Sequence, residues 1–142
     1  MQLTQFSDYA LRLMMVVACK KGELITIEEA AVTYGISRAH LMKVAQLLVR
    51  QGFLISVRGR SGGLTLSRPP ASILIGDIVR ATETDFAMVE CMQRGNRCKI
   101  TPACRLRGIL GDAVAAFLNV LDRFSLEDLL LSPEDFGFPA AA

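Results

Sequence analysis

The sequence predicts a mainly α-helical protein with one small β-hairpin: a winged helix-turn-helix followed by a long C-terminal helix. Apolar residues recur at helical spacing in several segments separated by glycine turns, and one alternating segment folds back at a glycine-rich turn. A chain of 142 residues can bury a core of its own. We expect a winged helix-turn-helix in residues 1–70, a linking helix and loop in 71–100, and a dimerisation helix with a C-terminal segment in 101–142.

Two helices are expected before the helix-turn-helix turn. The first is predicted over residues 6–20, where apolar side chains follow a helical period, and Gly22 ends it. Thr26 and Glu29 stand three residues apart, as in a capping box, where each side chain accepts a hydrogen bond from the other residue's backbone amide. This signature predicts a second, short helix that extends to Thr33.

A third helix and a hairpin complete the predicted winged unit. Gly35 supplies the turn, and Ser37 is placed to cap a helix that ends near Gly52. Residues 53–58 and 64–67 alternate between apolar and polar side chains around a glycine-rich turn, which is typical of a β-hairpin. Short helix, turn, longer helix and hairpin, in that order, describe a winged helix-turn-helix.

The second half of the chain is predicted to end in a long helix. A short helix is expected over residues 73–83, an irregular loop over 86–100, and a helix over 101–124, because Thr101 and Pro102 form a strong helix start. A further short helix starts at Ser125. The long helix carries apolar residues close to a heptad seam: Leu106, Leu110, Ala113, Phe117, Leu121 and Phe124.

The predicted long helix favours a homodimer. Its length of roughly 34 Å exceeds what a small winged unit needs for its own core. Gly108 and Gly111 fall in its first half, and glycine costs a helix about 1 kcal/mol relative to alanine, which suggests a close approach by another segment. The alternative is simple packing of this helix on its own domain.

The charge distribution points to a polyanionic partner for the first half only. Residues 1–70 carry nine Lys/Arg against four Asp/Glu, whereas residues 71–142 carry seven against ten. In a winged helix-turn-helix the N-terminal end of the third helix enters the major groove, and the hairpin reaches the backbone or minor groove. The candidate contacts to double-stranded DNA are therefore Ser37, Arg38, His40 and Lys43 on the helix, and Arg58, Gly59, Arg60 and Gly62 on the hairpin. Ser37 is useful as a helix cap in any case, and His40 could simply be exposed.

Several classes of protein find no support in the sequence. The longest apolar stretch is far below the roughly 20 residues of a membrane span. The first residues lack the basic-then-apolar order of a signal peptide, so a cytoplasmic protein is expected. An enzyme is not expected, since there is one histidine, no nucleotide-binding glycine motif and no carboxylate pair placed for acid–base work.

Three cysteines, Cys91, Cys98 and Cys104, lie within fourteen residues and supply three soft anionic ligands. Such a set suits an iron–sulfur cluster or zinc. A structural zinc usually shows paired knuckles, which this spacing lacks, so a cluster is the preferred reading. Cys104 is expected at the third position of the long helix, where the helix dipole would stabilise an anionic centre. Zinc and a set of redox-active thiols remain alternatives.

A [4Fe–4S] cluster needs a fourth ligand, and the candidates are Cys19 and Asp8. On one helix they would stand roughly 16 Å apart along the axis, so both cannot serve one site. Cys19 falls among apolar residues and could be an ordinary buried side chain. Asp8 could simply be an acid favoured by the helix dipole in a first turn.

At this point the residues resemble those of the winged-helix iron–sulfur transcription regulators, and most closely the nitric-oxide-sensing members. The resemblance covers nearly the whole chain, from Leu3 to Leu130. The wing signature is shared across that family, whereas Asp8 and the run around Cys104 are similar to the nitric-oxide-sensing members. The motifs that carry the resemblance are Phe6-Ser7-Asp8-Tyr9, Tyr34-Gly35-Ile36-Ser37, Val57-Arg58-Gly59-Arg60-Ser61-Gly62-Gly63 and Ile100-Thr101-Pro102-Ala103-Cys104-Arg105-Leu106.

The resemblance implies a homodimeric repressor with one [4Fe–4S] cluster per subunit. This repressor would bind a pseudo-palindromic operator and would leave the DNA when nitric oxide damages the cluster. Cys91, Cys98 and Cys104 would be ligands, with Asp8 reaching in from the partner subunit; a [2Fe–2S] cluster is the alternative cofactor. Cluster-assembly regulators of the family place a histidine where this chain has Arg107, which argues against that branch. Iron-responsive relatives remain the runner-up, and an iron–sulfur carrier or electron-transfer protein is the alternative of another class.

Overall fold

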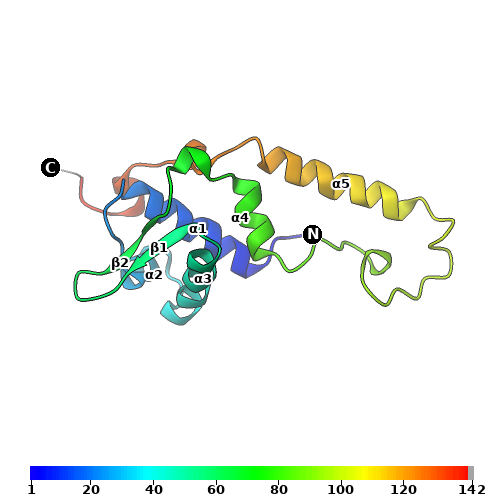
Figure 1. Ribbon diagram of the computed structural model, residues 1–142, viewed down its shortest axis with the longest axis horizontal. Coiled ribbons are helices and arrows are strands. Elements are labelled where there is room, and N and C mark those ends of the chain that lie inside the picture. Colours follow the sequence, from blue (N-terminus) through cyan, green and yellow to red (C-terminus); the bar gives the residue numbers. More distant parts are fainter. Residues whose placement is uncertain (141–142) are drawn as a thin grey trace.

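The protein, described as a computed structural model over residues 1–140, is a winged helix-turn-helix with a long helix beyond it (Figure 1). This confirms the predicted fold class; residues 141–142 of the predicted C-terminal segment lie outside the described residues. The main elements are α1 (Gln5–Cys19), α2 (Ile27–Tyr34), α3 (Arg38–Arg50), β1 (Leu54–Val57), β2 (Gly63–Leu66), α4 (Ile75–Thr82) and α5 (Leu106–Leu121). Four short 3-10 turns accompany them: Pro70–Ser72, Glu90–Met92, Leu126–Leu129 and Pro133–Phe136.

The predicted caps of the helix-turn-helix are present. Thr26 accepts a hydrogen bond from the Glu29 amide while the Glu29 carboxylate accepts one from the Thr26 amide, which completes the capping box of α2. Gly35 ends α2 with a φ of 62°, a left-handed conformation that glycine adopts without steric cost. Ser37 then caps α3 by accepting from the His40 amide. Local capping chemistry therefore fixes both ends of the turn.

The wing is a two-stranded antiparallel hairpin tied to the helical core. Leu54 pairs with Leu66 and Val57 with Gly63, and Ile25 forms an isolated bridge with Leu64. The core lies between α1, α3, α4 and the hairpin, and its largest fully buried side chains include Leu13, Met14, Ile25, Leu41, Leu48, Leu54, Ile73 and Ile78. This shared core holds α3 and the wing in one rigid unit.

The start of the long helix differs from the prediction. The helix begins at Leu106 and ends at Leu121, so that Thr101 and Pro102 stand in a turn and Cys104 lies outside the helix. Thr101 does not act as a cap because its hydroxyl donates to the carbonyl of Cys98 at 2.9 Å. The amide of Cys104 donates to the Ile100 carbonyl at 2.9 Å and continues this turn. The expected position of Cys104 in the first helical turn was therefore wrong.

α5 is the least packed helix of the described chain. It spans 16 residues, about 24 Å, and none of its residues is buried. Of the predicted seam, Leu106 and Phe124 are exposed, and Ile109 and Val120 add exposed apolar area outside the seam. In Figure 1 this helix extends away from the winged unit. Within residues 1–140 no helix is both long and apolar enough to cross a membrane.

Candidate DNA interface and cysteine loop

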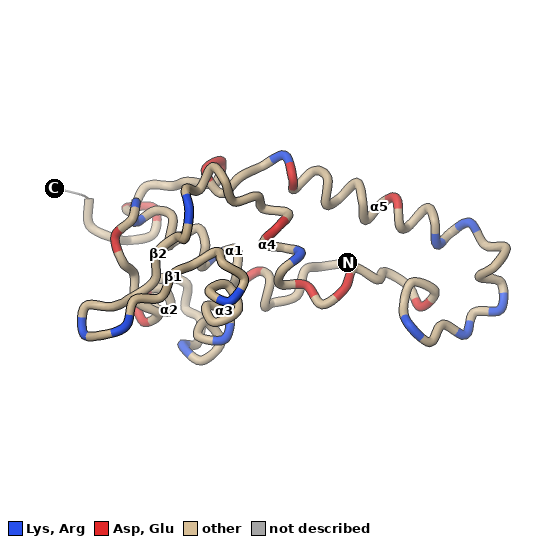
Figure 2. Tube along the Cα trace, in the orientation of Figure 1, with Lys and Arg blue, Asp and Glu red and all other residues tan. Residues whose placement is uncertain are grey.

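The N-terminal end of α3 presents the predicted DNA contacts to solvent. Ser37, Arg38, His40 and Lys43 are all exposed, whereas Leu41 of the same helix is fully buried. The exposed end is also the positive end of the helix dipole, which favours phosphate. Figure 2 shows Lys and Arg on α3 and at the hairpin tip, on the same side of the winged unit. One face of the unit is thus basic and carries hydrogen-bond donors.

The hairpin tip has a backbone that requires glycine. Gly59 has a φ of 110°, a conformation that other residues rarely adopt. The amide of Gly62 donates to the Gly59 carbonyl at 3.0 Å, and a Cβ atom at Gly62 would overlap the carbonyl oxygen of Val57. Arg58 and Arg60 flank this tight turn and are exposed. The tip therefore projects two guanidinium groups from a fixed backbone.

Helix α1 lies directly beneath the recognition helix. The two helices pack against each other, and the ring of Tyr9 on α1 lies 6.3 Å from the ring of His40 on α3, measured between centroids. Tyr9 is adjacent in sequence to Asp8, the candidate fourth ligand. Sequence motifs alone did not indicate a role for Tyr9, because its contact with His40 joins residues 31 positions apart. Any movement at the start of α1 is therefore close to the DNA-facing end of α3.

Cys91, Cys98 and Cys104 share one loop between α4 and α5, and all three are free thiols. Cys98 is exposed, while Cys91 and Cys104 are half-buried. Among residues 1–140 the structure brings no three Cys, His, Asp or Glu side chains together in a metal-binding arrangement. The residues fit a metal centre by the chemistry of their donor set, three thiols on one loop, which suits soft metals and iron–sulfur clusters.

Short-range hydrogen bonds hold the cysteine loop, and the hydrophobic core does not reach it. The Asn96 side chain donates to the Thr101 hydroxyl at 2.8 Å, and the Arg97 amide donates to the Glu90 carboxylate at 3.0 Å. Within the described chain, the core cluster takes no residue from positions 83 to 120. A loop held in this way can rearrange its side chains at small cost in packing.

Asp8 stands in the first turn of α1 and is held by Arg12. Their side chains form a two-point ion pair, with Arg12 Nε 2.9 Å from Oδ1 and Nη2 2.9 Å from Oδ2 of Asp8. The Arg12 guanidinium also lies over the Tyr34 ring at 5.9 Å, and the Tyr34 hydroxyl donates to the Arg12 carbonyl at 2.8 Å. Arg12 was missed at the sequence level, although a base four residues after an acid on a helix is a recognised pairing signal.

Cys19 is a buried core side chain. It is 1% exposed, and its Sγ donates to the Val16 carbonyl at 3.0 Å. Burial raises the pKa of this thiol, with a smaller opposing effect from Lys20. These features match the reading of Cys19 as an ordinary small apolar residue.

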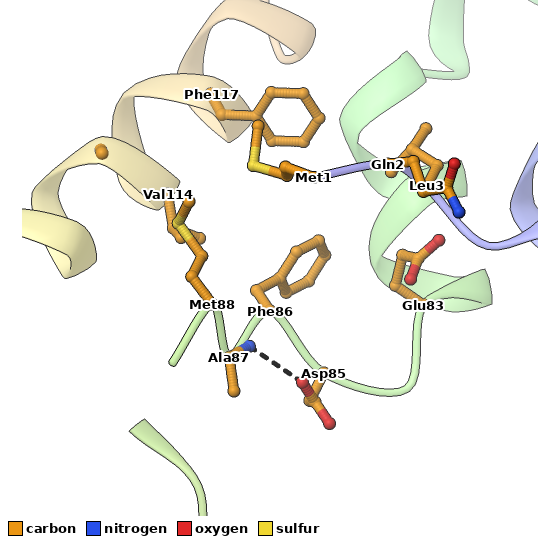
Figure 3. Close-up of a pocket in the computed structure, with 11 residues that line it drawn as sticks. Met1, Gln2, Leu3, Glu83, Asp85, Phe86, Ala87, Met88, Val114 and Phe117 are labelled. Carbon is orange, nitrogen blue, oxygen red and sulfur yellow. Dashed lines mark hydrogen bonds between the residues drawn. The ribbon is translucent and has the colours of Figure 1, made fainter. Parts of the chain in front are cut away.

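A cavity of about 620 Å³ separates α5 from the start of the chain. Its lining is mostly apolar, and Figure 3 shows Phe117 and Val114 of α5 facing Met1, Phe86 and Met88 across it. Glu83 and Asp85 stand at its edge after α4. The middle of α5 therefore borders this cavity.

Comparisons with known proteins identify relatives of this chain. Residues 3–132 match the Rrf2 family, described as "Iron-dependent Transcriptional regulator". The HTH-type transcriptional regulator NsrR of Bacillus subtilis is 44% identical over 137 residues, which cover 95% of this chain and 94% of that protein. NsrR of Geobacillus kaustophilus is 44% identical over 132 residues, covering 92% of this chain and 90% of that protein.

Solved structures show the same architecture. The global cysteine regulator CymR of B. subtilis has a TM-score of 0.68 at 28% identity, with 91% of this chain and 95% of that chain covered. IscR of T. potens has a TM-score of 0.72 at 23% identity, covers 91% of this chain and 85% of that chain, and supports the fold alone. The relatives are transcriptional regulators rather than enzymes. The chain belongs to the Rrf2 family of iron-dependent transcriptional regulators.

Proposed function

We propose that this chain is a cytoplasmic, homodimeric DNA-binding repressor whose iron–sulfur cluster makes DNA binding sensitive to nitric oxide. The observation that carries the proposal is the presence, in one chain, of a basic winged helix-turn-helix and three free cysteines on a single loop. The similarity to regulators named NsrR over nearly the full chain supports it.

In this proposal the winged unit binds a pseudo-palindromic operator. Arg38, His40 and Lys43 contact the major groove, and Ser37 caps the helix that carries them. Arg58 and Arg60 contact the backbone or minor groove, where the tight turn of Gly59 and Gly62 lets the wing approach closely. Two such units bind successive major grooves when their recognition helices lie about 34–36 Å apart.

The homodimer is proposed to form through α5. Its 16 residues include none that is buried within the chain, and Leu106, Ile109 and Val120 are about half exposed. An apolar helix face of this kind is costly to leave in water. Beyond the neighbouring residues and backbone of the same helix, no atom of the described chain lies within 4 Å of a Cβ placed at Gly108 or Gly111, so these glycines leave room for a second copy.

The proposed ligands of a [4Fe–4S] cluster are Cys91, Cys98 and Cys104 of one subunit and Asp8 of the partner subunit. When bound, the cluster supplies iron that can react with nitric oxide, and an oxygen ligand is harder and more exchangeable than thiolate. Arg12 contacts both oxygens of the Asp8 carboxylate and so keeps it oriented when it is not a ligand. Because Tyr9 follows Asp8 in sequence and its ring contacts His40 on α3, the bonding state of this carboxylate can influence the DNA-facing helix.

The test is an anaerobic titration of the purified protein with nitric oxide, with iron and sulfide measured at the start and DNA binding followed in parallel. We expect a cluster absorbance that bleaches as DNA binding is lost. A cluster that ignores nitric oxide but is lost on iron depletion would favour the iron-responsive alternative. The family description, "Iron-dependent Transcriptional regulator", is compatible with that alternative. A cluster without binding to any DNA duplex would favour a carrier or electron-transfer protein.

A further inference from the structure

The end of α5 is fixed to α4 by a two-point ion pair. Arg80 of α4 donates from Nη1 to Oδ1 of Asp122 at 2.7 Å and from Nη2 to Oδ2 at 2.6 Å. Asp122 is the C-terminal cap residue of α5, 42 residues after Arg80. Paired hydrogen bonds from one guanidinium to one carboxylate restrict orientation as well as distance.

Gly76 is what allows Asp122 to occupy this position. It is buried in the first turn of α4. A Cβ atom on Gly76 would overlap Oδ1 of Asp122 and would lie 2.9 Å from Nη1 of Arg80. Glycine in a helix interior costs stability relative to alanine, so its presence here has a steric reason.

Backbone hydrogen bonds fix the chain that leaves α5 at the same place. The amide of Ile75 donates to the Phe124 carbonyl at 3.0 Å, and the amide of Leu126 donates to the Ile73 carbonyl at 2.8 Å. Elsewhere α5 borders the cavity in Figure 3, and within residues 1–140 none of its side chains forms a hydrogen bond or ion pair with another element. The direction of α5 therefore depends on its C-terminal end.

The C-terminal end of α4 is fixed to the start of α1. The Ser7 hydroxyl donates to the Thr82 hydroxyl at 2.8 Å in a buried position. The Glu83 carboxylate accepts from the amide and hydroxyl of Thr4, the N-cap of α1, at 2.7 and 2.9 Å. Asp8 lies one helical turn after Thr4. α4 thus connects the segment that carries Asp8 with the end of α5.

We infer that Gly76, Arg80 and Asp122 form a joint that sets the direction of α5 relative to the winged helix-turn-helix, and that α4 couples this joint to the start of α1. The inference rests on the proposed function, in which α5 joins two winged units. These three are positioning residues, since their contacts within the described chain are with one another and with Asp77 rather than with the DNA-facing residues or the cysteine loop. In a dimer, the joint fixes the separation of the two recognition helices.

The experiment compares Asp122→Asn and Gly76→Ala with the wild type, and uses Asp77→Asn as the matched control. Asp77 lies 3.5 Å from Arg80 on the same helix but takes no part in the contact with Asp122. The probe is a duplex selected from a random library by the wild-type protein, together with versions in which one base pair is inserted between the half-sites. Circular dichroism, molar mass and cluster absorbance are measured on every variant.

We expect the wild type and Asp77→Asn to bind the selected duplex at least tenfold more tightly than the duplex with the inserted base pair. Asp122→Asn and Gly76→Ala should retain helix content, dimer mass and cluster absorbance but reduce this preference to about twofold or less. Retention of the full spacing preference by both variants would overturn the inference. If Gly76→Ala fails to fold, the spacing preference of Asp122→Asn alone decides whether the inference holds.

Small-angle X-ray scattering of the protein without DNA tests the joint separately from the proposed function. If the wild type selects no duplex, the proposed function is wrong, and scattering then tests the joint. A broader distribution of dimensions in Asp122→Asn than in Asp77→Asn supports the joint. Indistinguishable scattering curves refute it.

Discussion

At the scale of single residues, Gly62 shows how the wing depends on the absence of a side chain. A Cβ atom here would overlap the Val57 carbonyl oxygen and lie 2.9 Å from the Gly59 carbonyl oxygen. We therefore expect Gly62→Ala to distort the hairpin tip that carries Arg58 and Arg60, and to weaken DNA binding by roughly tenfold, about 1.4 kcal/mol. A mobility-shift titration measures the loss. Ser61→Ala, at an exposed neighbouring position, is the control, and equal affinity of the two variants would contradict the prediction.

Glu83 gives a residue-level prediction about pH. Burial alone would raise the pKa of this carboxyl, but hydrogen bonds from the amide and hydroxyl of Thr4 hold it below its usual value. A carboxyl with a lowered folded-state pKa adds stability above its unfolded pKa of about 4.3, and this stability is lost as the pH falls through the folded-state pKa. Glu83→Gln should thus lower the melting temperature at pH 7, and the difference from wild type should shrink in acid.

Thermal unfolding followed by circular dichroism from pH 7 to pH 3 checks this prediction. Glu23→Gln serves as the control because its side chain is exposed and lies outside the helices. A deficit for Glu83→Gln that is constant across this pH range would show that the carboxylate charge is not what stabilises the contact between α1 and α4.

At the scale of elements, the winged unit was predictable because its signals are local. The capping box of Thr26 and Glu29, the glycine turn at Gly35 and the alternation around the hairpin each act within a few residues of sequence. The start of α5 was not predictable in the same way. Thr101 and Pro102 resemble a helix start, but the Thr101 hydroxyl is engaged by the carbonyl of Cys98 and by the Asn96 side chain. The contact of Gly76 with Asp122 joins residues far apart in sequence and leaves no local pattern.

α5 itself carries the prediction that belongs to this scale. Ile109 is 58% exposed in the single chain, so Ile109→Glu should leave the fold of the subunit intact. In the proposed dimer the carboxylate would be buried against the second copy, which is costly for an unpaired charge. We expect the dimer dissociation constant to rise at least tenfold, measured by analytical ultracentrifugation. Asn119→Glu adds the same charge at an exposed polar position of the helix, and an equal effect of both variants would argue against a dimer face that includes Ile109.

At the scale of the whole molecule, the chain has a packed half and an open half. The core cluster ends at Ile78 and resumes at Leu126, while the cysteine loop and α5 lie beyond it in Figure 1. The sequence predicted the three cysteines as candidate ligands from their spacing, but spacing alone does not fix how a loop without core contacts places its thiols. Their convergence on one centre therefore stays a prediction that depends on the metal and on a second subunit.

This division predicts which segments change their hydrogen-exchange rates when the cluster is lost. Metal binding to a loop without its own core supplies the free energy that orders it, whereas the winged unit is ordered by buried side chains such as Leu13 and Leu41. Anaerobic hydrogen exchange should therefore show amides of residues 90–104 exchanging faster after cluster removal, by roughly tenfold or more, while the buried amides of α1 and α3 exchange at unchanged rates. An intermediate response at the start of α1 would follow from loss of the Asp8 ligand. Faster exchange spread evenly over the chain would instead mean that the cluster supports the entire fold, and equal exchange everywhere would mean that these cysteines hold no metal.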